Sequence, residues 1–223
     1  MCIRDRSGVT DFDEMTDISK ALRERLKADA YIAGAETERR YASRLDETVK
    51  YVFRLFDGEL IETVLMKYEH GYTVCISTQV GCRMGCKFCA SGINGLTRSL
   101  TASEMLAQIT AVQRDNNIRV SNIVMMGMGE PLDNFDNSVR FLKLVSDENG
   151  LNIGLRHISL STSGVVSGIK KLKEYNLPIT LSISLHAPSD DIRSSVMPVN
   201  KRWSIDELLA ACKEYQAGKG KLL

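Results

Sequence analysis

Strand-like and helix-like segments alternate four times after residue 73, and this alternation constrains the fold more than any other feature of the sequence. Apolar runs of β type occupy residues 73–79, 121–131, 156–164 and 179–188. Each run is followed by a segment with helical spacing, at residues 100–115, 137–150, 166–176 and 204–216. Such alternation predicts an α/β fold with a parallel sheet and right-handed crossovers. Four units do not close a barrel, so we expect either an open sheet or part of a barrel.

Two of these predicted helices begin with a capping box. Thr101 is followed three residues later by Glu104, and Ser204 by Glu207. In a capping box the hydroxyl and the carboxylate satisfy backbone N–H groups that the first helical turn leaves free. The two pairs therefore predict where the first and the fourth helix start.

The chain before residue 49 has a different pattern. Residues 11–48 are highly charged, and Ile18, Leu22 and Leu26 recur with helical spacing, which places them on one helix face. We expect residues 11–48 to be the remnant of an N-terminal helical domain. Residues 1–10 show no pattern that leads into it, and we interpret them as a non-native prefix in which Cys2 has no role.

Residues 49–72 carry a strong hairpin signal. Two β-type runs flank the dipeptide Asp57–Gly58, which is typical of a tight turn between antiparallel strands. We expect a β-hairpin here, followed by an α/β core over residues 73–223. The chain stops just after a helix, where a further strand should follow, so we expect the core to be truncated at its C-terminus.

Composition narrows the class of protein. The chain has 223 residues, 43% of them hydrophobic and 26% charged, which suits one large domain with a small appendage. No apolar run reaches the roughly 18 residues that span a membrane, and no signal segment opens the chain. We therefore expect a cytoplasmic protein without a membrane partner. The net charge of +1 gives no compositional support for a nucleic-acid partner.

The chemically active residue types lie together at one edge of the predicted sheet. Three cysteines follow the first strand, and residues 127–131, 161–164 and 184–188 end the next three. In a parallel α/β sheet the active site lies at the carboxyl ends of the strands. This shared location indicates a site more strongly than any single motif does.

Cys82, Cys86 and Cys89 are separated by three and then by two residues. A structural zinc site would need a fourth ligand, which would have to be Cys75 or a distant histidine. A thioredoxin-like use of Cys86 and Cys89 would leave Cys82 unexplained. An iron–sulfur cube held by three thiolates would leave one iron open to a small molecule. Cys212 shows helical spacing with its apolar neighbours, and we expect it to pack against the sheet.

The cysteine spacing resembles the signature of radical S-adenosylmethionine (SAM) enzymes, and Phe88 fits the aromatic position before the third cysteine. Residues 127–131, "GMGEP", resemble the element of those enzymes that binds the SAM amino group. Together with the segments "CISTQVGCRMGCKFCASGINGLTRSLTASEM", "LSTSGVV" and "SISLHAP", the chain is similar to the RlmN/Cfr family of radical SAM RNA methyltransferases from about residue 11 to residue 216. The resemblance implies a partial radical SAM (β/α) barrel with about four of six units.

The resemblance also implies roles for particular residues. Cys82, Cys86 and Cys89 match the ligands of a [4Fe–4S] cluster. Six further positions match residues that contact SAM: Gly129, Glu130, Ser161, Ser184, Leu185 and His186. Glu62 matches the proton acceptor at the adenine carbon, and Cys75 matches a cysteine that resolves a covalent enzyme–RNA intermediate through a disulfide.

The reaction implied by the resemblance is methylation of adenosine C2 in 23S rRNA and in tRNA next to the anticodon. It uses two SAM molecules, a methylated cysteine and an electron donor such as flavodoxin, and the enzyme is expected to be a monomer. The matching methyl-carrying cysteine lies beyond residue 223, so we expect this chain alone to be inactive. A Cfr-like C8 methyltransferase, and an iron–sulfur or zinc module without radical chemistry, remain the alternatives.

Overall fold

The sheet of this protein joins an antiparallel half to a parallel half. The computed structural model describes residues 8–32, 34–218 and 221–222. Its eight-stranded sheet has the order β1-β2-β3-β4-β7-β8-β9-β10. The strands are β1 (Glu36–Ala42), β2 (Val49–Arg54), β3 (Leu60–Tyr68), β4 (Gly71–Cys75), β7 (Val120–Met125), β8 (Ile158–Thr162), β9 (Thr180–Ile183) and β10 (Lys221–Leu222). Strand β4 pairs antiparallel with β3 and parallel with β7, so it is the seam between the two halves.

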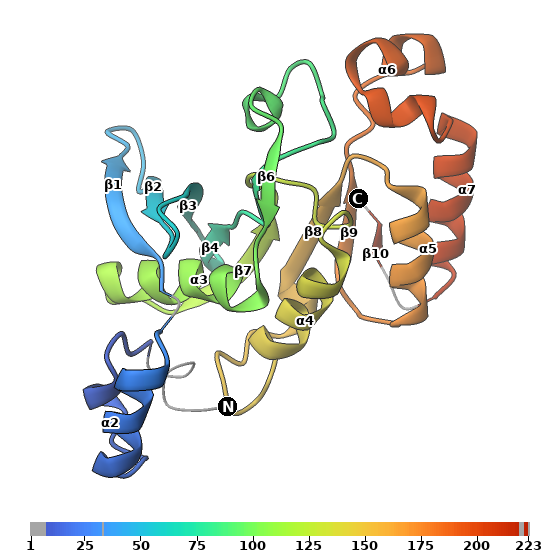
Figure 1. Cartoon of the computed structure of the whole chain (residues 1–223). Coiled ribbons are helices and arrows are strands. Elements are labelled where there is room, and N and C mark those ends of the chain that lie inside the picture. Colours follow the sequence, from blue (N-terminus) through green and yellow to red (C-terminus); the bar gives the residue numbers. More distant parts are fainter. Residues whose placement is uncertain (1–7, 33, 219–220, 223) are drawn as a thin grey trace.

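The parallel half has the predicted α/β order. The helices that follow its strands are α3 (Ala102–Asn116), α4 (Phe135–Val145), α5 (Val166–Glu174) and α7 (Ile205–Gln216). Figure 1 shows these helices on one side of the curved sheet, with α5 and α7 beside β8, β9 and β10. Both predicted capping boxes are present, at Thr101 with Glu104 and at Ser204 with Glu207. The partial barrel expected from the sequence is therefore confirmed.

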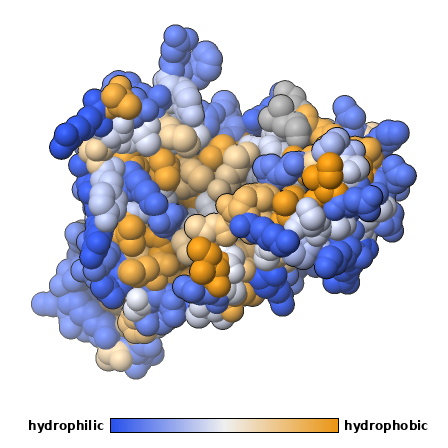
Figure 2. Space-filling model, turned by 90° about the horizontal axis from the view of Figure 1, so that it is seen from above, coloured by the Kyte–Doolittle hydropathy of each residue, from blue (hydrophilic) through white to orange (hydrophobic). Residues whose placement is uncertain are grey.

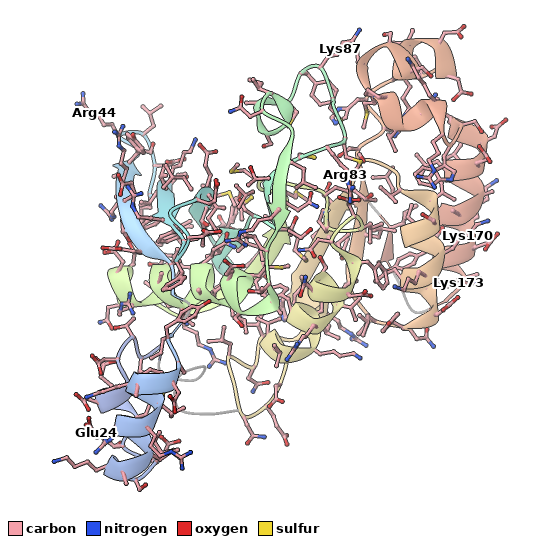
Figure 3. The ribbon with its side chains drawn as sticks, in the orientation of Figure 1. Glu24, Arg44, Arg83, Lys87, Lys170 and Lys173 are labelled. Atoms are coloured by element: carbon pink, nitrogen blue, oxygen red, sulfur yellow. The ribbon has the colours of Figure 1, made fainter. Side chains whose placement is uncertain are left out.

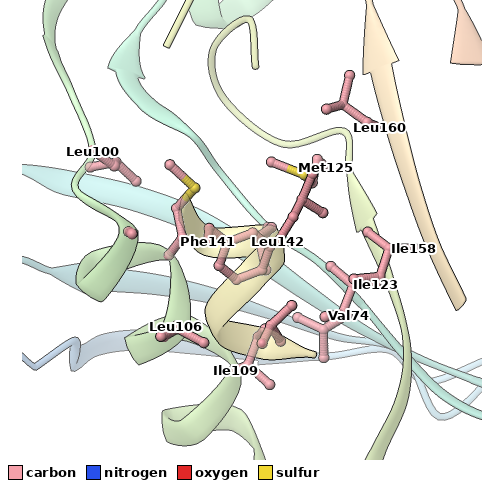
Figure 4. Packing of buried hydrophobic residues seen from close by; sticks show 14 of the residues in the cluster. Val74, Leu100, Leu106, Ile109, Ile123, Met125, Phe141, Leu142, Ile158 and Leu160 are labelled. Carbon is pink, nitrogen blue, oxygen red and sulfur yellow. The ribbon is translucent and has the colours of Figure 1, made fainter. Parts of the chain in front are cut away.

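The core lies between the sheet and these helices. Val74, Ile123 and Ile158 on the strands meet Ile109 and Phe141 on α3 and α4, and all five are almost fully buried (Figure 4). Burying one such side chain stabilises a fold by about 1.5–3 kcal/mol. Continuous apolar runs such as the one in β7 are typical of parallel strands that are buried on both faces, and they explain why the sequence predicted these strands.

The antiparallel half is larger than the predicted hairpin. β2 and β3 flank the turn at Asp57 and Gly58, as expected, but β1 adds a further strand that pairs antiparallel with β2. The expectation that residues 11–48 are helical is therefore wrong for Glu36–Ala42 and holds for α2 (Lys20–Asp29). All seven side chains of β1 are exposed, so this strand lacks the apolar–polar alternation by which a half-buried strand is recognised.

Smaller elements surround the predicted site. β5 (Gln79–Gly81) and β6 (Leu96–Ser99) pair antiparallel on either side of the cysteine segment, which we define as residues 82–89. Helix α6 (Asp190–Val196) and the 3-10 turn Pro198–Lys201 follow β9. Three other 3-10 turns lie at Phe12–Glu14, Ala90–Gly92 and Leu155–His157. The proposed prefix falls mostly on residues 1–7, which lie outside the described residues. None of the described helices has the length and apolarity to cross a membrane.

Candidate functional site

The carboxyl ends of the parallel strands surround one cavity of about 280 Å³. Its lining includes eight of the residues that the sequence singled out: Cys82, Cys86, Cys89, Gly129, Glu130, Ser161, Ser184 and His186. Among the six positions expected to contact SAM, Leu185 is the one outside the lining, and it is 37% exposed. Figure 2 looks down on this end of the molecule and shows hydrophobic residues in the middle of the face with hydrophilic residues around them. The fold thus brings together motifs that are about a hundred residues apart in the chain.

The cysteine segment is fixed to its surroundings at both ends. The Cys82 amide donates to the carbonyl of Gly95 at 2.8 Å, which continues the β5–β6 pairing. The Lys87 amide donates to the carbonyl of Val196 at 2.9 Å. Arg83 also donates to Asp133 at 2.8 Å, across to the segment that follows β7, while the Lys87 side chain extends away from the loop into solvent (Figure 3). These bonds hold the three thiols over the cavity.

The three thiols are free and partly withdrawn from solvent. Cys82 is buried, and Cys86 and Cys89 are half-buried. Burial raises the pKa of the Cys82 thiol to about 11, with a smaller contribution from the negative charge of Glu130. Burial also raises the pKa of Cys86. Metal ions bind thiolates, so loading of this site must release protons. Within the described part of the chain, no three His, Cys, Asp or Glu side chains are gathered around a single ion position.

Glu130 joins two of the strand ends. Its carboxylate is 3% exposed at the residue level and accepts hydrogen bonds from the amide and hydroxyl of Ser163, at 2.7 and 2.8 Å. The other oxygen accepts from the Leu132 amide at 3.0 Å. Burial raises the pKa of this carboxyl group, although these hydrogen bonds favour its charged form. Both carboxylate oxygens are thus engaged inside the protein, and they tie the segment after β7 to the segment after β8.

Gly129 is required by close packing beside this carboxylate. Its φ is +102°, and a Cβ atom there would lie 2.6 Å from Cβ of Gln79. The Gln79 side chain in turn accepts from the Glu130 amide at 2.9 Å. A side chain at position 129 would therefore displace the backbone that lines the cavity.

The ends of β8 and β9 form the opposite wall. The hydroxyl groups of Ser161 and Ser184 lie 3.4 Å apart, and the Ser184 amide donates to the Thr162 carbonyl at 2.9 Å. His186 has a φ of +55°, a left-handed conformation that is uncommon for a histidine. Its ring meets the edge of Phe88 at a centroid distance of 4.8 Å. The β9 end thereby touches the cysteine segment across the mouth of the cavity.

Glu62 and Cys75 lie beside this cavity rather than in its lining. Cys75 ends β4 and pairs with Val64 of β3 and with Val124 of β7. Glu62 is two residues from Val64, so its side chain emerges on the same face of the sheet. Its carboxylate pairs with the Lys50 ammonium at 2.6 Å, and both side chains are about half exposed.

The Cys75 thiol is positioned next to the cavity lining. Burial raises its pKa, while a hydrogen bond with the Met126 backbone acts in the opposite direction. Met126 is itself one of the lining residues. The sheet therefore places Glu62 and Cys75 on one face, next to the three-cysteine cavity. The spacing of these residues in the sequence could not have predicted this arrangement.

Sequence reasoning missed several residues at the site. Ser163 holds Glu130, Gln79 supports Gly129, and Met197 contributes to the lining. Arg193 is fully buried behind the wall. Its segment, "DDIRSSV", has the composition of a surface helix, so no pattern in the sequence indicated a buried arginine. By contrast, Cys212 is 2% exposed on α7 and packs in the core, as predicted.

Comparisons with known proteins show which families this chain resembles. The profile of the Radical SAM superfamily matches residues 76–221, and that of the Ribosomal RNA large subunit methyltransferase N-terminal domain matches residues 6–32. A "Probable dual-specificity RNA methyltransferase RlmN" of Alkaliphilus oremlandii is 54% identical over 214 residues. The protein of the same name from Clostridium novyi is 50% identical over 210 residues.

The likeness extends over most of this chain but over less of its relatives. The chain is covered to 96% and 94% in these two alignments, whereas it spans 62% and 61% of the relatives' own lengths. A solved structure, the "radical SAM methyltransferase from Sphaerobacter thermophilus", matches with a TM-score of 0.90 and 45% identity. That match covers 96% of this chain and 64% of the other.

Proposed function

Because the chain belongs to the radical SAM superfamily, we propose that it is the catalytic core of an RNA methyltransferase of the RlmN type. The observation that carries the proposal is the convergence of three free thiols, the Gly129–Glu130 backbone and the ends of β8 and β9 on one cavity. Relatives that are named as RNA methyltransferases, at 50–54% identity, support the same assignment.

The residues around the cavity fit the two cofactors of the superfamily, a [4Fe–4S] cluster and SAM. Three sulfur donors from one short segment suit an iron–sulfur cube better than a magnesium or calcium ion, which prefers oxygen ligands. Cys82, Cys86 and Cys89 would hold the cluster. Gly129, Glu130, Ser161, Ser184, Leu185 and His186 would border SAM. When bound, the cluster supplies the electron for the reductive cleavage of SAM, and a small protein such as flavodoxin would deliver that electron.

Glu62 and Cys75 would act on the RNA. A half-exposed carboxylate on the open face of β3 can accept a proton from a base that lies against the sheet, and its ion pair with Lys50 restricts its orientation. The Cys75 thiol, between β3 and β7 at the strand ends, would resolve the covalent intermediate. Its sulfur would form a disulfide with the sulfur of the methyl-carrying cysteine, while the bond from that sulfur to the methylene carbon breaks, leaves its electron pair with the base and yields the methyl group after proton uptake.

The proposed substrate is adenosine at C2 in 23S rRNA and in tRNA, and the competing product is the C8-methylated base. Mass spectrometry of RNA modified by the full-length gene product distinguishes them. We expect 2-methyladenosine in both RNAs, whereas 8-methyladenosine would favour the Cfr-like alternative. A Cys75→Ala variant should accumulate a protein–RNA crosslink, and normal turnover without trapped RNA would remove Cys75 from the mechanism.

A second candidate is a zinc or iron–sulfur module without radical chemistry, since three thiols can also contribute to a structural metal site. Metal content after purification and anaerobic reconstitution separates the two. Tight zinc binding with no uptake of iron would favour that module, and an iron–sulfur cluster that responds to SAM would favour the methyltransferase.

A further inference from the structure

Arg193 on α6 is a fully buried cation directly behind the wall of the cavity. Among the described residues, Arg193 is one of the largest whose side chain is fully buried. The guanidinium donates to the carbonyls of Ser163 at 2.6 Å, Ser184 at 3.3 Å and Leu185 at 3.1 Å, and to Oδ1 of Asn200 at 2.8 Å. All four partners are neutral oxygen atoms. The guanidinium therefore has hydrogen-bond acceptors, but no negative group balances its positive charge.

None of the carboxylates in the described part of the chain forms an ion pair with Arg193. The nearest one in the hydrogen-bond network is Asp190, which accepts from Nδ2 of Asn200 at 2.8 Å and is exposed to solvent. Burial lowers the pKa of Arg193, yet a guanidinium stays protonated in proteins. An unpaired buried cation destabilises the folded protein by several kcal/mol unless a negative group compensates its charge.

The three-cysteine cavity lies beside Arg193 and could hold such a negative group. Ser163 and Ser184, whose carbonyls Arg193 binds, both line the cavity with Cys86. Helix α6 also contacts the cysteine segment directly, because the Lys87 amide donates to the carbonyl of Val196. Met197, which follows α6, is a further lining residue. Arg193 is therefore separated from the cavity by little more than the backbone that it holds.

We propose that Arg193 is the buried counter-charge of the three-cysteine site, and that it raises the reduction potential of the cluster bound there while fixing the carbonyl ends of the β8 and β9 segments. The inference rests on the proposed function. Arg193 is a positioning and electrostatic residue, since its hydrogen bonds go to the wall and not into the cavity.

The sign of the effect follows from the charges. A [4Fe–4S] core held by three thiolates carries a net negative charge, and one-electron reduction makes it more negative. A nearby cation in a low-dielectric interior stabilises the reduced form more than the oxidised form. Arg193 should therefore make the cluster easier to reduce, and loss of its charge should lower the potential.

Two substitutions of Arg193 separate charge from size. Arg193→Met removes the charge and keeps most of the volume, whereas Arg193→Lys retains the charge with fewer hydrogen bonds. We expect the midpoint potential, measured by redox titration with EPR detection on the reconstituted protein, to fall in Arg193→Met and to stay close to the wild-type value in Arg193→Lys. Arg202→Met, which removes an exposed charge from the residue that follows the 3-10 turn Pro198–Lys201, should leave the potential unchanged.

A second design leaves the arginine in place. The double variant Asp190→Asn with Asn200→Asp moves one carboxylate onto the Arg193 guanidinium without altering the total charge. It should lower the potential as Arg193→Met does, and it decides the question if Arg193→Met fails to fold. Potentials of the double variant and of any folded Arg193→Met protein that equal the wild-type value would overturn the proposal.

Iron content keeps this outcome distinct from failure of the proposed function. A wild-type protein that binds no iron–sulfur cluster would overturn both proposals. A wild-type cluster whose EPR signal responds to SAM, together with a potential that is insensitive to the Arg193 charge, would overturn only the role of Arg193.

Discussion

At the scale of single residues, the three thiols should act as one set. Replacing Cys82, Cys86 or Cys89 with alanine leaves two thiolates, which cannot hold a cube that needs at least three. We expect each variant to lose stable iron binding after anaerobic reconstitution. Cys75→Ala and Cys212→Ala are the matched controls, because both thiols lie outside the cavity lining, and both should retain iron. Wild-type iron content in Cys86→Ala would contradict the assignment.

Tyr215 offers a test of the core at the same scale. Its hydroxyl is buried with no hydrogen-bond partner among the described residues, and burial raises its pKa to about 12. Tyr215→Phe should therefore hold stability or raise it, by up to about 1 kcal/mol. Tyr51→Phe is the control, since the Tyr51 hydroxyl donates to Asp115 and accepts from Asn116, and it should lose about 1 kcal/mol. Urea unfolding at pH 7 measures both.

The raised pKa of Tyr215 also predicts an alkaline effect. The folded state favours the neutral phenol, so its contribution is fully present below the unfolded value of about 10. It is lost progressively as the pH rises from there through the folded value of about 12. The free energy of unfolding should fall less steeply over this range in Tyr215→Phe than in the wild type, and parallel curves would contradict the prediction.

Single residues also show what a sequence can and cannot predict. The spacing of Cys82, Cys86 and Cys89 is a local feature of the sequence, so their place together at one site could be predicted. The engagement of both Glu130 oxygens by Ser163 and Leu132 was not, because it depends on how the segments after β7 and β8 meet.

At the scale of elements, the start of α3 combines a capping box with a largely buried ion pair. Glu104 accepts from the amide and hydroxyl of Thr101, and its two oxygens also accept from Arg98 at 2.8 and 3.0 Å. Glu104→Gln should cost about 1–3 kcal/mol, since it removes the charge from a bidentate pair that is largely buried. Glu207→Gln in the exposed capping box of α7 is the matched control, and it should cost about 0.5 kcal/mol.

The Glu104 effect should depend on pH. Burial acts to raise the pKa of this carboxyl, but its bonds to Arg98 and Thr101 outweigh burial and lower it. Its stabilisation is therefore present above the unfolded value of about 4.3 and is lost as the pH falls through the lower folded value. The difference between wild type and Glu104→Gln, measured by urea unfolding, should shrink in acid, and a constant difference would contradict this account.

Elements differed in how well the sequence predicted them, for physical reasons. The long helices and the buried parallel strands carry strong periodicity and capping signals. β1 has no buried side chain, β5 and β6 are three and four residues long, and α6 hides a buried arginine in a polar segment. These elements are stabilised by tertiary pairing, which a local pattern does not record.

At the scale of the whole molecule, the sheet places two groups of predicted site residues on one face. The parallel half supports the three-cysteine cavity, and the antiparallel half presents Glu62 beside Cys75 at the seam. The α/β order was predictable from alternation alone. How the hairpin joins the parallel half was not, because β4 pairs with β7 across more than forty intervening residues.

The central claim is that this cavity holds a SAM-binding iron–sulfur cluster, and EPR spectroscopy tests it most directly. The chain is reconstituted anaerobically with iron and sulfide, reduced, and measured with and without SAM. We predict about four irons per chain and a cluster signal that changes when SAM is added. Zinc binding without iron, or a cluster signal that SAM leaves unchanged, would contradict the account.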